Sequence, residues 1–543
     1  MWKKFFKQKV NSIAVAAVLV AVSSLISRLL GVFRDGILAN QFGAGQKLDI
    51  YYAAFRIPDL LFNLIVLGAL SAGFIPIFSG LVKDFTNPEK NDNQEAWRLA
   101  NNVINLLSLF LAVISLFGII FAPALISLIT PGFSAEAQAA TVSLTRIMFL
   151  SPLFLGISGV LGGMLQSFRR FFIYSLAPIF YNLGIIAGAL WFSKWWGISG
   201  LAWGVVLGAF LHMLIQMPAV YSLGFRYSLK INFRDKPTIR IGKMMVPRTL
   251  SLAITQIDLL VTTIIASGLM AGSLTVFNLA NNLQSFPVGI FGVSFAIAAF
   301  PALSQYAFNK EKLEANFSST LRQIFFFVIP STVFLITLRA QIIRVILGSG
   351  AFNWQNTILT MNTLALFSIS LFAQASIPLM VRVFYARHNS RTPFYLGIFT
   401  VAVDIILCLT LSKRMGVTGL ALSYSISNIL NFLLLWTWLY IKVGNLGIAK
   451  IVNSAIKFGL ASIGAGLTIQ LMKIAVLPII DMTRFSGVFI QLIVAASAGG
   501  VVYLVLCYLL GSEEVVTFIN IIRHRLPFKT HHNLDDSGEA RGL

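Results

Sequence analysis

The sequence predicts an all-α integral membrane protein with about 14 transmembrane helices, and composition and hydropathy carry that prediction. Hydrophobic residues fill 57% of the 543 positions and charged residues only 11%, and the mean hydropathy is +0.83. A soluble chain of this length needs polar surfaces, with about 25% charged residues. A lipid-facing surface has no such need, and helices satisfy their own backbone hydrogen bonds inside a bilayer.

Apolar segments that can cross a bilayer core, which takes about 20 residues per helix, recur along the whole chain. Four lysines precede the first segment, as in a signal peptide, but it is too long for one and lacks a small-residue cleavage site, so we expect it to be retained. The expected spans lie near residues 12–38, 50–82, 98–121, 138–167, 173–193, 198–223, 241–268, 273–304, 319–339, 355–385, 392–412, 416–441, 451–474 and 484–511.

Basic residues set the expected orientation. The chain has 41 Lys and Arg against 19 Asp and Glu, a net charge of +22. In a membrane protein this excess indicates loops beside an anionic leaflet, so we expect no nucleic-acid partner. The N-terminus, the loops after even-numbered spans and the C-terminal tail hold 23 Lys and Arg, whereas the other loops hold five. The positive-inside rule then places both termini in the cytoplasm.

An internal repeat divides the chain. Residues 197–204 (GISGLAWG) reappear as residues 416–423 (GVTGLALS), and Arg169, Arg170 and Pro178 precede the first copy much as Arg387 and Pro393 precede the second. An interval of six helices keeps the topology, so we expect two parallel six-helix repeats with a substrate site between them. The expected parts are an N-lobe (1–223), a basic linker (224–240), a C-lobe (241–441), two further helices (442–511) and a cytoplasmic tail (512–543).

The sequence shows no pattern typical of an enzyme. The segment 43–47 lacks the spacing of a nucleotide-binding loop and does not follow a strand. The five histidines do not pair with Cys or Glu at the spacing of metal ligands, and Cys408 and Cys507 lie in apolar runs. We therefore expect a transporter without a catalytic or ATPase site. The sequence identifies no metal site, and we expect no cofactor apart from a coupling ion, either sodium or a proton.

Charged residues inside the first two spans are the best candidates for a function, because ionisable groups are costly in a membrane and usually face a polar cavity. Arg28 and Asp35 lie two turns apart on one helix face, and Ser27 and Arg34 share another. Span 2 adds Asp49, Arg56 and Asn63. Arginines with acidic neighbours suit a phosphate or diphosphate. The alternative is a structural Arg28–Asp35 pair, with Arg34 extending to the headgroups.

These residues resemble the MurJ (MviN) family of lipid II flippases, within the multidrug/oligosaccharidyl-lipid/polysaccharide exporter superfamily. The resemblance extends over the whole chain. The similar segments are residues 27–35 (SRLLGVFRD), 42–45 (FGAG), Asp49, 54–58 (AFRIP), 74–76 (FIP), 286–292 (FPVGIFG) and 301–304 (PALS).

The resemblance implies two lobes around a cationic cavity and a groove for a polyprenyl tail on the last two expected spans, 451–474 and 484–511. It also implies alternating access that moves lipid II from the inner to the outer leaflet. It places Arg28, Arg34, Asp35 and Asp49 at functional positions of the family. The implied partners are lipid II or a similar polyprenyl-diphosphate saccharide, membrane lipids and cell-wall synthesis proteins, and the implied location is the bacterial cytoplasmic membrane.

The chain departs from the family pattern in its cavity charges. Phe62, Asn63 and Leu67 stand where many members have basic residues and a glutamate, and Asn282 stands in place of an arginine. The cavity is therefore expected to be less cationic than the family norm. This leaves open an exporter of another polyprenyl-linked saccharide or of drugs, and, from a different class, a non-transporting scaffold for envelope assembly.

Two acids lie alone in the second half, Asp258 in span 7 and Asp404 in span 11. Family members often carry an acid at the position of Thr262, one turn beyond Asp258 and on the same face. Asp258, Thr262 and Asp404 are thus candidates for a coupling sodium or proton site. The alternative is that each acid is protonated, or capped by a nearby Ser or Thr.

Overall fold

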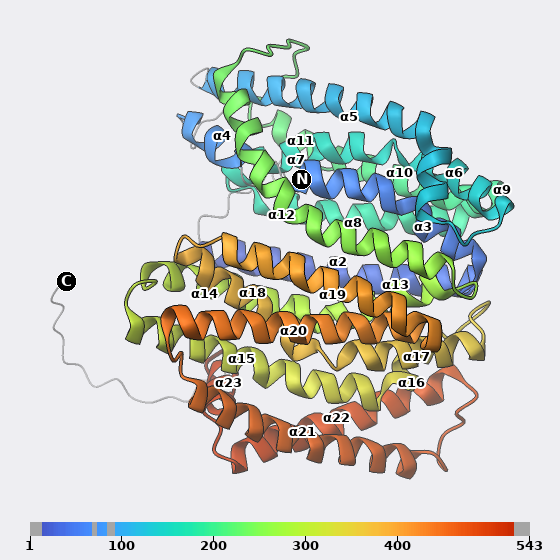
Figure 1. The fold of residues 1–543 in the computed structure, drawn as a ribbon, viewed down its shortest axis with the longest axis vertical. Coiled ribbons are helices and arrows are strands. Elements are labelled where there is room, and N and C mark those ends of the chain that lie inside the picture. Colours follow the sequence, from blue (N-terminus) through green and yellow to red (C-terminus); the bar gives the residue numbers. More distant parts are fainter. Residues whose placement is uncertain (1–12, 68–72, 84–92, 526–543) are drawn as a thin grey trace.

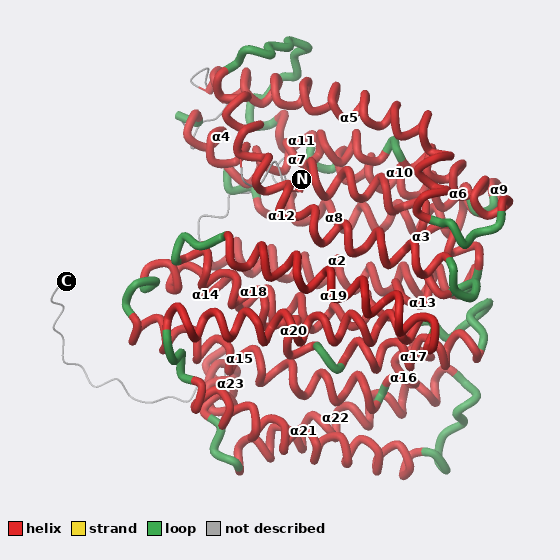
Figure 2. Tube along the Cα trace, viewed as in Figure 1, coloured by secondary structure: helices red, strands yellow, loops and turns green. Residues whose placement is uncertain are grey.

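The computed structural model describes residues 13–67, 73–83 and 93–525, and within these ranges the chain is helical with no strand. Most helices lie side by side along one direction, with the first half of the chain stacked on the second (Figures 1 and 2). The predicted fold class is confirmed.

The first half contains twelve labelled segments, of which η1 and η4 are π-helical. Their bounds are α2 Ile13–Phe42, α3 Gln46–Leu61, η1 Phe62–Leu67, α4 Ile75–Leu81, α5 Gln94–Ile129, α6 Ala135–Met148, α7 Ser151–Ser167, α8 Phe171–Ala187, η4 Gly188–Phe192, α9 Ser193–Trp196, α10 Ser199–Leu214 and α11 Met217–Tyr221.

The second half begins with α12, which packs against helices of both halves, namely α5 and α19. Its bounds are α12 Lys236–Ser267, α13 Ser273–Pro287, η5 Val288–Val293, α14 Ser294–Gln305, α15 Lys310–Thr337, α16 Arg339–Ile346, α17 Trp354–Ser368, α18 Leu371–Ala386, α19 Arg391–Met415, α20 Val417–Val443, α21 Ile448–Val476, α22 Phe485–Leu509 and α23 Glu513–Arg525.

Ten helices among the described residues are long and apolar enough to cross a membrane, and the bent pair α17–α18 makes eleven. The other expected spans correspond to α2, to α3 through α4, and to α12, which carry charged residues or border residues outside the described ranges. The count of fourteen agrees with this arrangement and stays a prediction.

Polar caps mark where several helices begin. Asp235 accepts a hydrogen bond from the backbone N–H of Thr238 at the start of α12 (3.0 Å). Asn309 and Asn353 make the same contact at the starts of α15 and α17. Each side chain satisfies one of the backbone donors that a first helical turn leaves unpaired.

The internal repeat is visible in the backbone. Gly197 and Gly416, which open the two copies, have nearly equal angles, φ 54° and ψ −135° against φ 61° and ψ −138°. Arg169 and His388, at the preceding helix–helix turns, are the two non-glycine residues with positive φ among those described. The two halves therefore make the same unusual turns at matching positions, as parallel repeats should.

Each half has its own aromatic core. In the first, Phe74 and Phe78 stack at 5.1 Å and Trp97 stacks on Phe168 at 5.5 Å. In the second, Phe326 of α15 contacts Phe458 of α21 and Tyr503 of α22, each at 5.6 Å. The two helices that follow the repeats are thus packed on the second half through α15.

Glycines bring α8 and the following segment η4 into direct backbone contact with α10. A Cβ atom built on Gly184 overlaps the backbone of Gly208, and one built on Gly188 overlaps Gly204. Small residues of this kind let membrane helices approach closely enough to pack through their backbones.

We expect Gly184→Ala to lower the free energy of unfolding by about 1–3 kcal/mol, the usual cost of overpacking. Gly459→Ala is the matched control, because its Cβ meets nothing within 4 Å, and it should be neutral or slightly stabilising through helix propensity. Thermal unfolding in one detergent measures both. Equal shifts would contradict the packing role of Gly184.

Candidate functional site

The charged residues of α2 lie where the two halves meet, at a seam between α2 and α3 on one side and α12, α13 and η5 on the other (Figure 1). Arg34 donates to Asp35 through Nε (3.0 Å) and Nη2 (2.8 Å). Asp35 is 4% exposed, and its second oxygen accepts from Asn282 of α13 at 2.8 Å. The pair is thereby tied to the second half.

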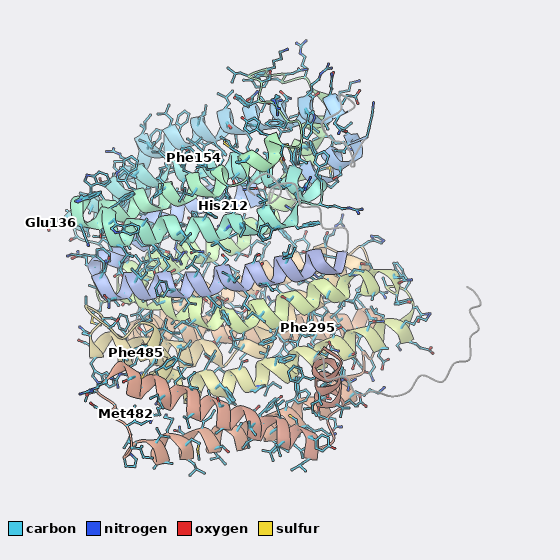
Figure 3. The ribbon with its side chains drawn as sticks, turned by 180° about the vertical axis from the view of Figure 1, so that it is seen from behind. Glu136, Phe154, His212, Phe295, Met482 and Phe485 are labelled. Atoms are coloured by element: carbon cyan, nitrogen blue, oxygen red, sulfur yellow. The ribbon has the colours of Figure 1, made fainter. Side chains whose placement is uncertain are left out.

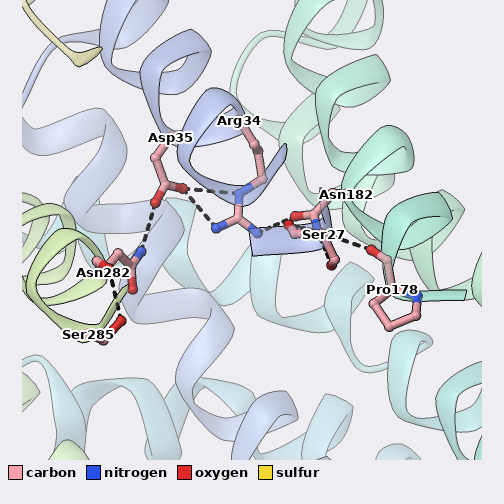
Figure 4. A network of polar contacts seen from close by, with 7 residues as sticks. All are labelled: Ser27, Arg34, Asp35, Pro178, Asn182, Asn282 and Ser285. Carbon is pink, nitrogen blue, oxygen red and sulfur yellow. Dashed lines mark hydrogen bonds and ion pairs between the residues drawn. The ribbon is translucent and has the colours of Figure 1, made fainter. Parts of the chain in front are cut away.

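Asn182 of α8 completes this network, which Figure 4 shows from close by. Its side-chain oxygen accepts from Nη1 of Arg34 at 3.1 Å. Its amide nitrogen donates to the backbone oxygen of Pro178 (3.0 Å) and, at 3.4 Å, to Ser27. The sequence analysis missed Asn182, although a lone amide in an apolar span is itself a signal of a buried polar contact.

The structural alternative of an Arg28–Asp35 pair is wrong. Asp35 turns to its own neighbour Arg34, because its carboxylate faces α13 rather than the preceding turns of α2. Arg28 is exposed and its guanidinium lies against Gly289 in η5, where any Cβ atom would collide with it. No hydrogen bond or ion pair joins Arg28 to another described residue, so its donors remain available to a ligand.

Asp49 lies at one end of the same seam and is 3% exposed. One carboxylate oxygen accepts from the backbone N–H of Gly272 (2.6 Å), and the other from the N–H and hydroxyl of Thr275 (2.8 and 2.6 Å). Asp49 thus caps the first turn of α13 from outside that helix. Its carboxylate is already fully used for joining the two halves.

Arg56 has hydrogen-bond partners on the second half, whereas Asn63 has its partner in the first half. Arg56 crosses the seam, donating to Thr263 of α12 (2.9 Å) and Asn278 of α13 (2.8 Å). Asn63 stays on its own helix and donates to Asp59, one turn earlier, at 2.9 Å. The seam therefore combines Ser27, Arg28, Arg34, Asp35, Asp49, Arg56 and Asn282, while Asn63 contacts it only through Asp59.

The two lone acids meet within the second half. Asp258 of α12 and Asp404 of α19 are in side-chain contact, and neither Oδ1 atom has a hydrogen-bond donor. Cys408, one turn beyond Asp404, contacts it at 3.7 Å and Ser423 at 2.8 Å. Thr262 is buried one turn beyond Asp258. The sequence pointed to both acids but could not show that they touch.

A long apolar groove of about 520 Å³ opens beside the second half. Its walls come from α15 and α22, with Pro287 and Phe291 at one side and Phe518 of α23 at the end. Of the two helices that follow the repeats, where the tail groove is predicted, α22 lines this groove together with α15, and α21 contributes none of the lining residues. A polyprenyl tail in this groove stays a prediction.

Comparison with known proteins decides the family. A family model described as lipid II flippase MurJ matches residues 38–497. The chain belongs to the MurJ family.

Individual relatives agree with this membership. The chain is 31% identical to a protein named as a probable lipid II flippase MurJ from Buchnera aphidicola subsp. Schizaphis graminum, over 91% of this chain and 96% of that protein. A lipid II flippase MurJ from Burkholderia cenocepacia is 28% identical over 82% of this chain and 86% of its own length.

Solved structures share the fold. A lipid II flippase MurJ in an inward closed conformation matches with TM-score 0.75 and 24% identity, over 93% of this chain and 100% of that one. An inward-facing multidrug transporter of the MATE family matches with TM-score 0.63 and 16% identity, over 79% of this chain and 98% of its own.

We expect Arg34→Met to lower the free energy of unfolding by about 3 kcal/mol, because it leaves the buried Asp35 carboxylate without its cation. Arg34→Met combined with Asp35→Asn should recover part of this loss, since no unpaired charge remains. Thermal unfolding in one detergent compares the two variants. A double variant no more stable than the single one would show that the ion pair does not hold the seam.

Proposed function

We propose that this protein is a lipid II flippase that moves undecaprenyl-diphosphate-linked peptidoglycan precursor across the membrane by alternating access. Membership of the MurJ family carries the proposal. The seam supplies the matching chemistry, because Arg28 offers a planar set of donors suited to a diphosphate and lies exposed beside the backbone of Gly289.

The three seam arginines have different roles in this proposal. Arg34 is held within the first half by Asp35 and Asn182, and Arg56 is held across the seam by Thr263 and Asn278. Arg28 alone among the three lacks a partner in the described residues. It therefore binds the anionic headgroup, while Arg34 fixes Asp35 and Arg56 joins the two halves. Asn282 contributes a neutral donor to Asp35 in place of a further cationic group.

The proposed surroundings follow from the same role. The protein resides in the bacterial cytoplasmic membrane with both termini in the cytoplasm, binds lipid II and the surrounding lipids, and uses no catalytic or ATPase step of its own. The groove between α15 and α22 is the proposed place for the polyprenyl tail. Contact with cell-wall synthesis proteins stays a prediction.

Orientation is tested with reporters in two loops. A reporter inserted after residue 45, between α2 and α3, should be active outside the cell, and one inserted after residue 235, just before α12, inside it. These positions follow the excess of basic residues in loops on the proposed cytoplasmic side. The opposite activity at either position would contradict the proposed topology.

Function is tested by complementation of a bacterial strain depleted of its lipid II flippase. The unaltered chain should restore growth and Arg28→Met should not, while Arg28→Lys should restore it only partly, because lysine is a point charge without the planar fork. Arg414→Met is the matched control, since Arg414 is exposed at the end of α19. Growth supported equally by Arg28→Met would favour the non-transporting scaffold.

We further propose that Asp258 and Asp404 form the coupling site for a sodium ion or proton. Two carboxylates in contact inside a membrane repel each other, so the pair is stable only with a shared proton or a bound cation. A cation that binds one conformation more tightly shifts the carrier towards that state.

The double variant Asp258→Asn with Asp404→Asn should reduce turnover about tenfold, within the usual range of coupling free energies, while lipid II binding changes little. Asp481→Asn is the control, an exposed acid between α21 and α22. Transport assays in vesicles over a range of sodium concentrations and pH measure turnover. Unchanged turnover throughout would exclude the acidic pair as a coupling site.

A further inference from the structure

A polar cavity of about 310 Å³ lies far from the seam, where α15 and α21 begin and α23 folds back. Its lining residues are Glu311, Glu314, Ala315, Ser318, Arg322 and Lys450. All but Lys450 belong to one face of α15, at the helical spacing of three and four residues. In Figure 3, Phe485 and Met482 mark the end of the second half that lies opposite this cavity.

Backbone geometry keeps this cavity open. Gly447 precedes α21 with φ +78°, a conformation that favours glycine. A Cβ atom there would come within 3.0 Å of the Ser318 hydroxyl and 3.4 Å of a Glu314 carboxylate oxygen. Ser318 is only 4% exposed, and its hydroxyl has no hydrogen-bond partner in the structure. A buried polar group without a partner calls for an explanation, and a ligand in this cavity would supply one.

The charges around the cavity are separated. Glu311 and Glu314 supply two carboxylates, and Lys450 is an exposed ammonium on α21. Arg322 donates from Nη1 to Glu513 (2.9 Å) and pairs with Glu514 (2.8 Å), so its charge is taken up by α23. These contacts lower the pKa of Glu513, so the ion pair persists to lower pH than the ordinary pKa of a glutamate would allow.

The two carboxylates, unpaired among the described residues, and the ammonium select the ligand. A simple anion would face Glu311 and Glu314, and a simple cation would face Lys450. A zwitterion with a phosphate and a primary ammonium satisfies both, because the carboxylates accept from its ammonium while Lys450 donates to the phosphate.

The position of the cavity indicates that the zwitterion is part of a lipid. Val452, Ile456 and Leu460 form an exposed apolar face further along the same helix, α21, and are 49%, 56% and 55% exposed. The acyl chains of a lipid whose headgroup is held at Lys450 would lie on this apolar surface of α21.

We propose that this cavity binds the phosphoethanolamine headgroup of a phospholipid in the adjoining leaflet, the inner one in the orientation proposed above. Lys450 faces the phosphate, and Glu311, Glu314 and Ser318 face the ammonium. Residues 513–525, which Arg322 holds beside the cavity, lie beyond the stretch matched by the family model.

Lipid retention by the delipidated full-length protein, measured by native mass spectrometry, tests this site. Phosphatidylethanolamine should bind about tenfold more tightly than phosphatidylglycerol, which lacks the ammonium, or phosphatidylcholine, whose quaternary ammonium donates no hydrogen bond. Glycerophosphoethanolamine, without acyl chains, should bind far more weakly. Equal or tighter binding of any of these three probes would overturn the proposal.

Two variants locate the contacts. Glu311→Gln with Glu314→Gln should remove the preference for phosphatidylethanolamine, and Lys450→Gln should weaken phosphatidylethanolamine and phosphatidylglycerol alike. Glu136→Gln and Lys413→Gln are the matched controls, because both residues are exposed at the opposite end of the helices (Figure 3 for Glu136).

Thermal unfolding verifies that each variant remains folded, which is expected because the altered side chains lie at the cavity surface. An unchanged lipid preference in the glutamate variant, or an equal loss in the controls, would overturn the assignment. Because the readout is lipid retention, the result does not depend on whether the protein transports lipid II.

Discussion

Inside a bilayer, a buried carboxylate must find its hydrogen-bond partners within the protein, and this requirement organises the seam between the two halves. Asp35 and Asp49 project from α2 and α3 and find their partners on α13. Arg56 of α3 likewise donates to α12 and α13. Apart from the Arg34–Asp35 pair, the first half therefore depends on polar groups of the second half to satisfy these charges.

The seam and the lobe interiors are held together by different forces. Between α8 and α10, glycines allow backbone to touch backbone over several turns, and aromatic side chains fill the cores. The seam instead consists of a modest number of hydrogen bonds, each contributing about 0.5–1.5 kcal/mol net. A contact of this kind can open and close while the lobes stay intact, as alternating access by rigid-body motion requires.

The C-terminal part adds surfaces that face lipid rather than the seam. Arg322 sits at the meeting point of two of them, since it binds α23 and also lines the polar cavity. Phe518 of α23 closes one end of the apolar groove and packs on Phe326 and Phe327. One short helix therefore borders both the apolar groove and the headgroup cavity, so displacement of α23 would alter the two sites together.

The sequence by itself determined the membrane class, the helical fold, the six-helix repeat and the residues of interest on α2 and α3. Hydropathy, the matching glycine turns and the cost of charge in lipid are local properties, so they can be predicted from the sequence alone. Partner choice is not local. Only the tertiary structure decided that Asp35 pairs with Arg34 and Asn282, that Asn182 joins them, and that Asp258 touches Asp404. It also decided that Arg28 has no hydrogen-bond or ion-pair partner among the described residues. The partners of a side chain depend on which helices pack beside it, and helix periodicity contains no information about that neighbour.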